Sequence, residues 1–73
     1  MLANLKLQKI GENINKIRVL KGISIETLSI NTNIRKEYLV KIEKGKAIGM
    51  KISHILKIAR GLMVYPSEIV DGV

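Results

Sequence analysis

The sequence predicts an all-α protein made of five short helices. Apolar residues recur every three to four positions along the chain, as on one face of a helix, and no sustained alternation indicates a strand. Residues that typically begin or end helices interrupt this pattern at Gly22, Asn33, Gly45 and Pro66. The 73 residues leave room for one small domain, which we expect to cover residues 1–73 with its core between residues 10 and 70.

The first helix is expected to run from Asn4 or Leu5 to Lys21, with residues 1–9 extending it beyond the core. Gly22 is a typical stop after a last turn that ends in lysine. Gly11 is expected to weaken this helix by about 1 kcal/mol relative to alanine. The inward-facing positions follow steps of three and four residues: Leu7, Ile10, Ile14 and Ile17.

The segment 24–46 predicts two helices joined by a tight turn. The second helix begins at Ser24, whose hydroxyl can accept a hydrogen bond from a free backbone N–H group. Its Leu28 faces inward. Asn33 is expected to be the turn residue because asparagine tolerates a left-handed backbone, and Ile34 then packs beneath the two helices.

The same signals predict the remaining helices. The third spans Arg35 to Lys44, the fourth runs from Met50 or Lys51 to Arg60 or Gly61, and the fifth starts near Pro66, which suits a first helical position. The positions expected to face the core are Leu39 and Ile42 in the third helix, Ile52, Ile55, Leu56 and Ala59 in the fourth, and Ile69 and Val70 in the fifth. His54 is expected to be an ordinary surface or edge residue.

Basic residues are concentrated in the second half of the chain. The formal net charge is +7, and the segment from Arg35 to Arg60 contains eight basic and two acidic residues. A one-sided basic field attracts a polyanion such as nucleic acid. The alternative is that lysine merely solvates an isoleucine-rich protein.

Composition argues against several classes of function. The absence of cysteine excludes disulfides and thiolate metal sites, and a single histidine cannot form a metal site either. We find no nucleophile–base pair and no phosphate-binding glycine loop, so we expect neither an enzyme nor a bound cofactor. No signal peptide and no apolar run of membrane-spanning length is present, so we expect a cytoplasmic protein without membrane contact.

Several short motifs occur in a characteristic order. They are Ile10-Gly11-Glu12-Asn13-Ile14 with Ile17-Arg18, Lys21-Gly22-Ile23-Ser24, Leu28, Tyr38-Leu39 with Lys41-Ile42-Glu43-Lys44-Gly45-Lys46, and Leu56-Lys57-Ile58-Ala59-Arg60. In this order, over residues 10–70, they resemble the Xre family of phage-repressor-like (Cro/repressor-type) helix-turn-helix DNA-binding proteins. The resemblance implies a five-helix fold whose second and third helices form the helix-turn-helix, with the third entering the major groove of double-stranded DNA.

The resemblance also implies roles for individual side chains. Arg18 and Glu43 would pair between the first helix and the end of the recognition helix. The base-reading positions would be Lys36, Glu37, Val40 and Lys41, with Tyr38 as an alternative contact to a thymine methyl group. Phosphate contacts would come from Ser24, Thr27, Arg35, Lys44 and Lys46. Lys41 can equally be a solvating charge, and Glu37 can simply stabilise the start of its helix.

The sequence departs from the family pattern at two positions near the DNA. Ile25 stands where the family often has a glutamine that contacts DNA, and it cannot donate a hydrogen bond. Arg35 stands where a small hydroxyl residue usually caps the third helix, which loses about 1 kcal/mol but offers a cation to phosphate.

A single recognition helix reads few bases, so the resemblance implies a homodimer on a palindromic site. The residues expected at the self-contact are Ile48, Met50, Val64 and Tyr65, although Ile48 and Val64 can also be core residues. Three functions remain open: a transcriptional regulator acting as a repressor or autoregulator, the antitoxin of a toxin–antitoxin pair, and a protein-interaction module that does not bind DNA. The basic recognition helix argues against the third.

Overall fold

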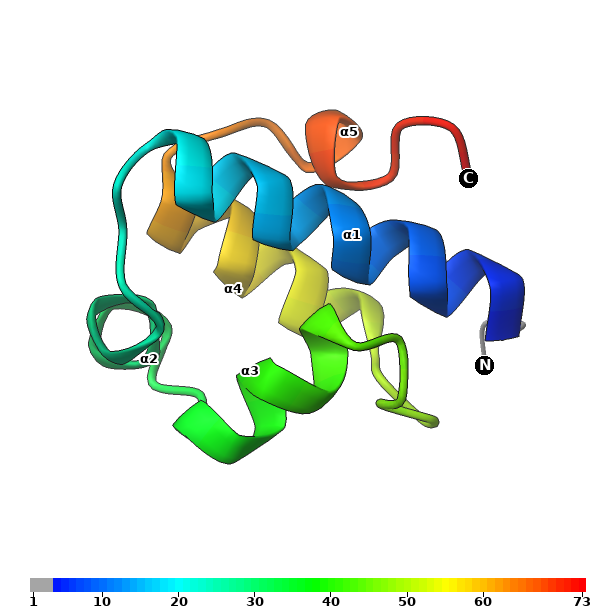
Figure 1. Cartoon of the computed structure of the whole chain (residues 1–73), viewed down its shortest axis with the longest axis horizontal. Coiled ribbons are helices and arrows are strands. Elements are labelled where there is room, and N and C mark those ends of the chain that lie inside the picture. Colours follow the sequence, from blue (N-terminus) through cyan, green and yellow to red (C-terminus); the bar gives the residue numbers. More distant parts are fainter. Residues whose placement is uncertain (1–3) are drawn as a thin grey trace.

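The computed structural model describes residues 4–73, with side chains from residue 6 onward. Residues 1–3 of the predicted N-terminal extension lie outside the described part. Five helices follow one another along the chain (Figure 1): α1 Asn4–Leu20, α2 Ile25–Thr32, α3 Lys36–Glu43, α4 Ile52–Leu62 and α5 Pro66–Ile69. No strand occurs between residues 4 and 73, so the all-α prediction is confirmed. No helix in this range is long and apolar enough to cross a membrane.

The long helix α1 organises the fold. It packs against α3, α4 and α5, while α2 packs against α3 and α4 (Figure 1). The Asn13 side chain of α1 donates hydrogen bonds to the carbonyl oxygens of Ile69 and Asp71, both at 2.8 Å, and thereby holds the C-terminal segment against α1. Every helix contributes to one apolar core, whose most buried side chains are Leu7, Ile10, Ile14, Leu28, Leu39, Ile42, Ile58, Leu62 and Ile69.

The predicted inward face of the fourth helix is partly wrong. Ile55 and Ala59 are buried, but Ile52 is 66% exposed and Leu56 is 48% exposed. The other residues that α4 buries are Ile58, Gly61 and Leu62. Apolar side chains cover more than one stripe of this helix, so their spacing alone does not determine which stripe packs inward.

The C-terminal helix buries one of its two predicted core residues. Ile69 is fully buried, whereas Val70 is exposed. Val70 is the C-cap residue of α5, with φ −97° and ψ 12°. The prediction for Val70 is therefore wrong: adjacent residues of a helical turn point about 100° apart, so Val70 cannot share the inward direction of Ile69.

Gly11 has a packing role that helix propensity does not reveal. A Cβ atom at this position would collide with the carbonyl oxygen of Ile42 and would lie 2.7 Å from that of Glu43. Real Cβ atoms essentially never approach other atoms this closely, so glycine permits the contact between α1 and the end of α3. Glycine inside a helix is therefore destabilising by itself, but at this position it permits a close helix–helix contact that a larger residue would prevent.

Candidate nucleic-acid interface

The start of α2 and the turn after it have the predicted conformation. Ser24 is the N-cap, and its Oγ accepts a hydrogen bond from the backbone N–H of Thr27 at 3.0 Å. The Ser24 hydroxyl also donates to Thr27 Oγ1 at 2.9 Å. At the other end, Asn33 adopts the left-handed conformation, with φ 58° and ψ 29°. The predicted cap and turn residue are both confirmed.

Hydrogen bonds inside the turn set the relation between α2 and α3. Ser29 Oγ donates to the carbonyl oxygen of Ile34 at 2.6 Å. Thr32 Oγ1 donates to the Leu28 carbonyl at 2.7 Å and accepts from the Ile34 N–H at 3.3 Å. Ile34 is buried beneath the turn, as predicted. Sequence reasoning missed the role of Thr32. Threonine is polar, so it does not contribute to the apolar spacing from which the core residues were predicted, although its hydroxyl can bond nearby backbone groups.

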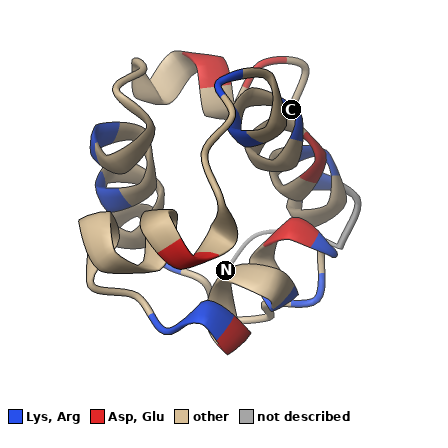
Figure 2. Cartoon of the chain, turned by 60° about the vertical axis from the view of Figure 1, so that its left-hand side comes forward, with Lys and Arg blue, Asp and Glu red and all other residues tan. Residues whose placement is uncertain are grey.

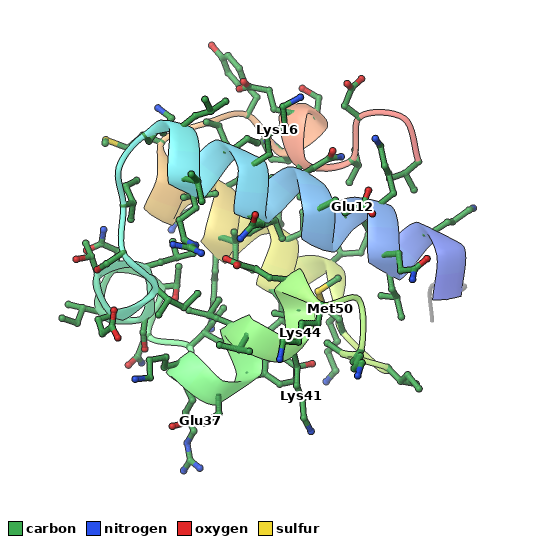
Figure 3. The ribbon with its side chains drawn as sticks, viewed as in Figure 1. Glu12, Lys16, Glu37, Lys41, Lys44 and Met50 are labelled. Carbon is green, nitrogen blue, oxygen red and sulfur yellow. The ribbon has the colours of Figure 1, made fainter. Side chains whose placement is uncertain are left out.

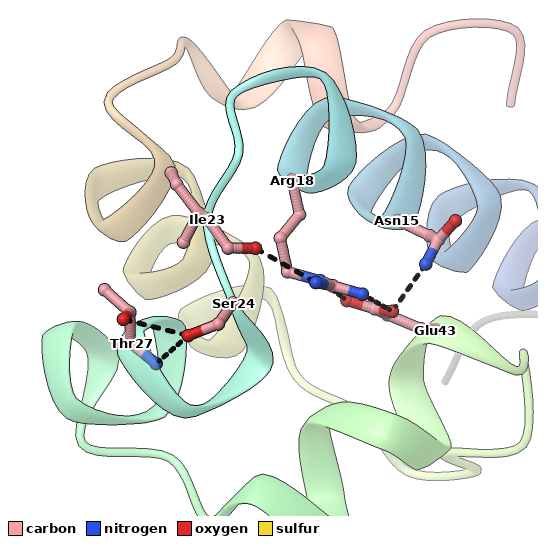
Figure 4. A network of polar contacts seen from close by, with 6 residues as sticks. All are labelled: Asn15, Arg18, Ile23, Ser24, Thr27 and Glu43. Atoms are coloured by element: carbon pink, nitrogen blue, oxygen red, sulfur yellow. Dashed lines mark hydrogen bonds and ion pairs between the residues drawn. The ribbon is translucent and has the colours of Figure 1, made fainter.

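Arg18 joins α1 to both helices of the helix-turn-helix (Figure 4). Its Nε donates to Glu43 Oε2 at 2.7 Å and its Nη2 donates to Glu43 Oε1 at 3.0 Å. Its Nη1 donates to the carbonyl oxygen of Ile23, just before α2, at 3.0 Å. Asn15 Nδ2 adds a bond of 2.8 Å to Glu43 Oε1. The side chains of Arg18 and Glu43 are only 16% and 10% exposed.

This network is a charge-assisted, bidentate contact of the kind that defines geometry as well as energy. Hydrogen bonding to Glu43 raises the pKa of the Arg18 guanidinium above its usual value. The network contains the pair implied by the family resemblance. Asn15 was not anticipated, since an asparagine on an exposed part of a helix carries no distinctive signal in the sequence.

The outward face of α3 carries the expected base-reading side chains. Lys36, Glu37 and Lys41 are exposed, and Val40 is half-buried. Figure 3 shows Glu37 and Lys41 directed away from the other helices. Tyr38 instead packs against the core and its ring centroid lies 5.3 Å from that of His54, so its ring is engaged in packing.

The expected phosphate-binding residues lie at three places around α3. Ser24 and Thr27 are exposed at the start of α2, Arg35 lies at the N-cap of α3, and Lys44 and Lys46 follow its C-terminal end. All five have exposed side chains. Arg35 makes no capping hydrogen bond, as expected for a residue without a side-chain acceptor. Ile25 packs against the core and makes no polar contact of the kind that the usual glutamine would offer.

The basic residues of the second half of the chain do not all lie on one face. Figure 2 shows basic positions on α4 on a different side of the domain from those of α3. The α4 cations, Lys57 and Arg60, are exposed there. The prediction of a one-sided field therefore holds for the residues around α3 and is wrong for those of α4, because the loop between the helices turns α4 away.

Two of the four residues expected at a self-contact are well exposed. Ile48 is 69% exposed on the loop before α4, and Tyr65 is 77% exposed between α4 and α5. Val64 is half-buried and packs against the core. The expectation for Met50 is wrong: it is only 4% exposed, because the loop folds its side chain inward as part of the core. His54 is an edge residue whose Nδ1 accepts the Lys51 N–H at 3.0 Å at the start of α4.

Comparison with known proteins agrees with this geometry. Residues 13–72 match the family model described as the Cro/C1-type HTH DNA-binding domain. The chain belongs to the Cro/C1-type helix-turn-helix family. The matched region covers α2 to α5 and the second half of α1, and it includes both Arg18 and Glu43.

Individual proteins are also similar to this chain. The HTH-type transcriptional regulator SlrR of Bacillus subtilis (strain 168) is 34% identical over 63 residues, which are 86% of this chain. The match spans only 41% of SlrR. The crystal structure of the restriction-modification controller protein C.AhdI from Aeromonas hydrophila superposes with a TM-score of 0.83 at 31% identity. That match covers 89% of this chain and 97% of the C.AhdI chain, which confirms the predicted fold.

Proposed function

We propose that this protein is a sequence-specific DNA-binding transcriptional regulator, acting as a repressor or autoregulator on a palindromic operator. The observation that carries the proposal is the outward face of α3, where Lys36, Glu37 and Lys41 are exposed on a helix that Arg18 holds in place through Glu43. The names of two similar proteins, a transcriptional regulator and a restriction-modification controller, support a regulatory role.

The chemistry of α3 suits the edges of base pairs in the major groove. A lysine ammonium group can donate to O6 and N7 of guanine, and a glutamate can accept from N4 of cytosine. Each well-formed base contact gives about 1–3 kcal/mol of discrimination. In this proposal Lys41 and Glu37 read bases, while Lys44 and Lys46 bind phosphates and hold the helix in register.

A second copy of the chain would complete the binding site. One eight-residue recognition helix contacts few base pairs, and two copies placed one DNA turn apart read a palindrome. The charge distribution supports self-association through α4 and α5. The α4 helix carries Lys57 and Arg60 and no acidic residue, whereas the short segment from Tyr65 to Val73 carries Glu68 and Asp71 and no basic residue. These charges are complementary between two copies.

A protein partner is a second candidate for the same surface. The side chains of Ile52, Leu56 and Met63 are exposed on α4 and its C-cap. An antitoxin would use such a surface to bind its toxin while α3 remains available to DNA. Co-expression with the product of an adjacent toxin-like gene, followed by co-purification, tests this candidate. If the protein purifies without the co-expressed product and still binds DNA, the result would favour a regulator that acts without a protein partner.

The decisive experiment measures binding of the purified protein to DNA from just upstream of its own gene and to random DNA, at two salt concentrations. Selective binding with a two-fold-symmetric footprint is expected. Equal, weak binding to both DNAs that is lost at moderate salt would contradict the proposal, since it would leave only non-specific attraction to phosphates.

A further inference from the structure

An ion pair links the two helices of the helix-turn-helix on their exposed side. The ammonium group of Lys36, the first residue of α3, lies 3.4 Å from Oε2 of Glu26, in the first turn of α2. Both side chains remain exposed to solvent. Glu26 is the only acidic residue of α2, and it lies between Ser24 and Thr27, the residues expected to contact phosphate.

The Glu26 carboxylate is stabilised in its charged form. Its own backbone N–H and the Lys36 ammonium lower the pKa of the Glu26 carboxyl below its usual value. The negative charge is thus persistent at neutral pH, at the N-terminal end of α2, a helix end that otherwise suits a phosphate oxygen.

Stability does not explain this pair. Ion pairs between exposed side chains contribute a median of about 0–1 kcal/mol and weaken further in salt. A carboxylate that faces a DNA backbone also repels it. Glu26 also suits the positive end of α2, as any acidic residue in a first turn does, at about 0.3–1 kcal/mol. Within a surface that attracts a polyanion it is nevertheless an electrostatic cost, and its ion pair offers a further reason for its presence.

The position of Lys36 supplies this reason. A lysine at the start of α3 can reach either a base edge or the nearest phosphate, because its side chain is long and its charge is not directional. Phosphate contacts bind all sequences alike and carry no sequence information. A carboxylate that holds the Lys36 ammonium group beside α2 makes the contact of Lys36 with a phosphate less favourable.

We propose that Glu26 is a specificity-determining residue that withholds Lys36 from DNA phosphates. It lowers the affinity for random DNA and leaves the contact of Lys36 with its base as the favourable one. This inference rests on the proposed function, and it adds the residue that separates selective from non-specific binding.

The test compares Glu26→Gln with Glu12→Gln, a matched control that makes the same change of charge on an exposed position of α1. Figure 3 shows Glu12 on α1, far from Glu37 and Lys41. Binding of each variant to random DNA and to the upstream DNA is measured across a salt series. We expect Glu26→Gln to bind random DNA roughly 3–10-fold more tightly, with a salt slope steeper by about 0.9, as for one additional phosphate contact. The ratio of selective to random binding should fall, and Glu12→Gln should change neither quantity comparably.

The double variant Glu26→Gln/Lys36→Met identifies the cation involved. If Glu26 acts through Lys36, its substitution has little effect on random DNA once Lys36 is removed. An equal effect with and without Lys36 would overturn the inference, as would an equal gain on both DNAs. Unchanged binding of random DNA by Glu26→Gln would overturn it whether or not the upstream DNA is an operator. Absence of selectivity in the unmodified protein would instead contradict the proposed function, while the effect of Glu26→Gln on random DNA would still test whether Glu26 withholds Lys36 from phosphates. Circular dichroism of each variant confirms that it is folded.

Discussion

The guanidinium of Arg18 donates hydrogen bonds to both carboxylate oxygens of Glu43, at 2.7 Å and 3.0 Å. The same guanidinium bonds the carbonyl oxygen of Ile23, which directly precedes the N-cap of α2. One side chain of α1 therefore positions the start of one helix of the motif and the end of the other. The relative placement of the expected phosphate contacts and base contacts depends on it.

Substitution of Glu43 by alanine should reduce the free energy of unfolding by about 2–3 kcal/mol. This is below the roughly 3–5 kcal/mol typical of a fully buried pair, because both side chains keep some exposure. Arg18→Lys should not restore stability, since an ammonium group cannot make the bidentate contact. Urea denaturation measures both variants. A loss below about 0.5 kcal/mol for Glu43→Ala would mean that the pair contributes no more than an exposed one.

Substitution of Gly11 by alanine should destabilise the protein by about 1–3 kcal/mol, although alanine is the better helix former. The added methyl group would collide with backbone carbonyl oxygens of Ile42 and Glu43, which cannot move without shifting α3. Glu12→Ala, at the next and exposed position, serves as the control. Thermal denaturation should show a lower Tm for Gly11→Ala only. A higher Tm would show that α3 moves away from α1 without cost.

Substitution of Lys41 and of Lys46 by alanine should have different consequences for DNA binding. Lys46→Ala should weaken binding to all sequences alike and reduce the salt slope by about 0.9, as expected for a lost phosphate contact. Lys41→Ala should change the preferred sequence, at a cost of about 1–3 kcal/mol on the best site. Selection from a randomised DNA pool reads out both effects. Identical behaviour of the two variants on every sequence would contradict this division of roles.

Substitution of Met50 and of Ile48 by alanine should separate core from surface in the loop before α4. Met50→Ala should lower the free energy of unfolding by about 2–5 kcal/mol, because it leaves a cavity among buried side chains. Ile48→Ala should leave monomer stability nearly unchanged. If Ile48 lies at the contact between two copies, the Ile48→Ala variant should need a higher protein concentration to form the dimer, as measured by analytical ultracentrifugation. A concentration-dependent effect of Met50→Ala without loss of stability would contradict its assignment to the core.

Local signals in the sequence identified the elements of the fold. Serine as an N-cap, asparagine in a left-handed turn and glycine after a helix each act through their own backbone, so their effects are readable without knowledge of the remaining chain. The structure confirms Ser24 and Asn33 in these roles. The motif order identified the family, and with it the pairing of Arg18 with Glu43 that no local rule supplies.

The faces of helices were harder to predict where apolar residues exceed the number that can be buried. Leu56 and Ile52 are as apolar as Ile58, yet they remain exposed. Met50, expected at a surface, lies in the core because the loop brings it there. The error for α4 arises because spacing specifies a helix, whereas the angle at which that helix meets its neighbours selects the buried stripe. The error for Met50 arises because apolar spacing does not specify the path of a loop.

The sequence alone determined five helices, the helix-turn-helix and the basic character of α3, because these depend on residue type and short spacing. Only the tertiary structure decided that Gly11 faces the backbone of α3, that Asn15 joins Arg18 at Glu43, and that Glu26 meets Lys36. Each of these contacts joins residues of different helices. Such contacts depend on distances that are set by the packing of the whole core, so they cannot be predicted from the order of the residues alone.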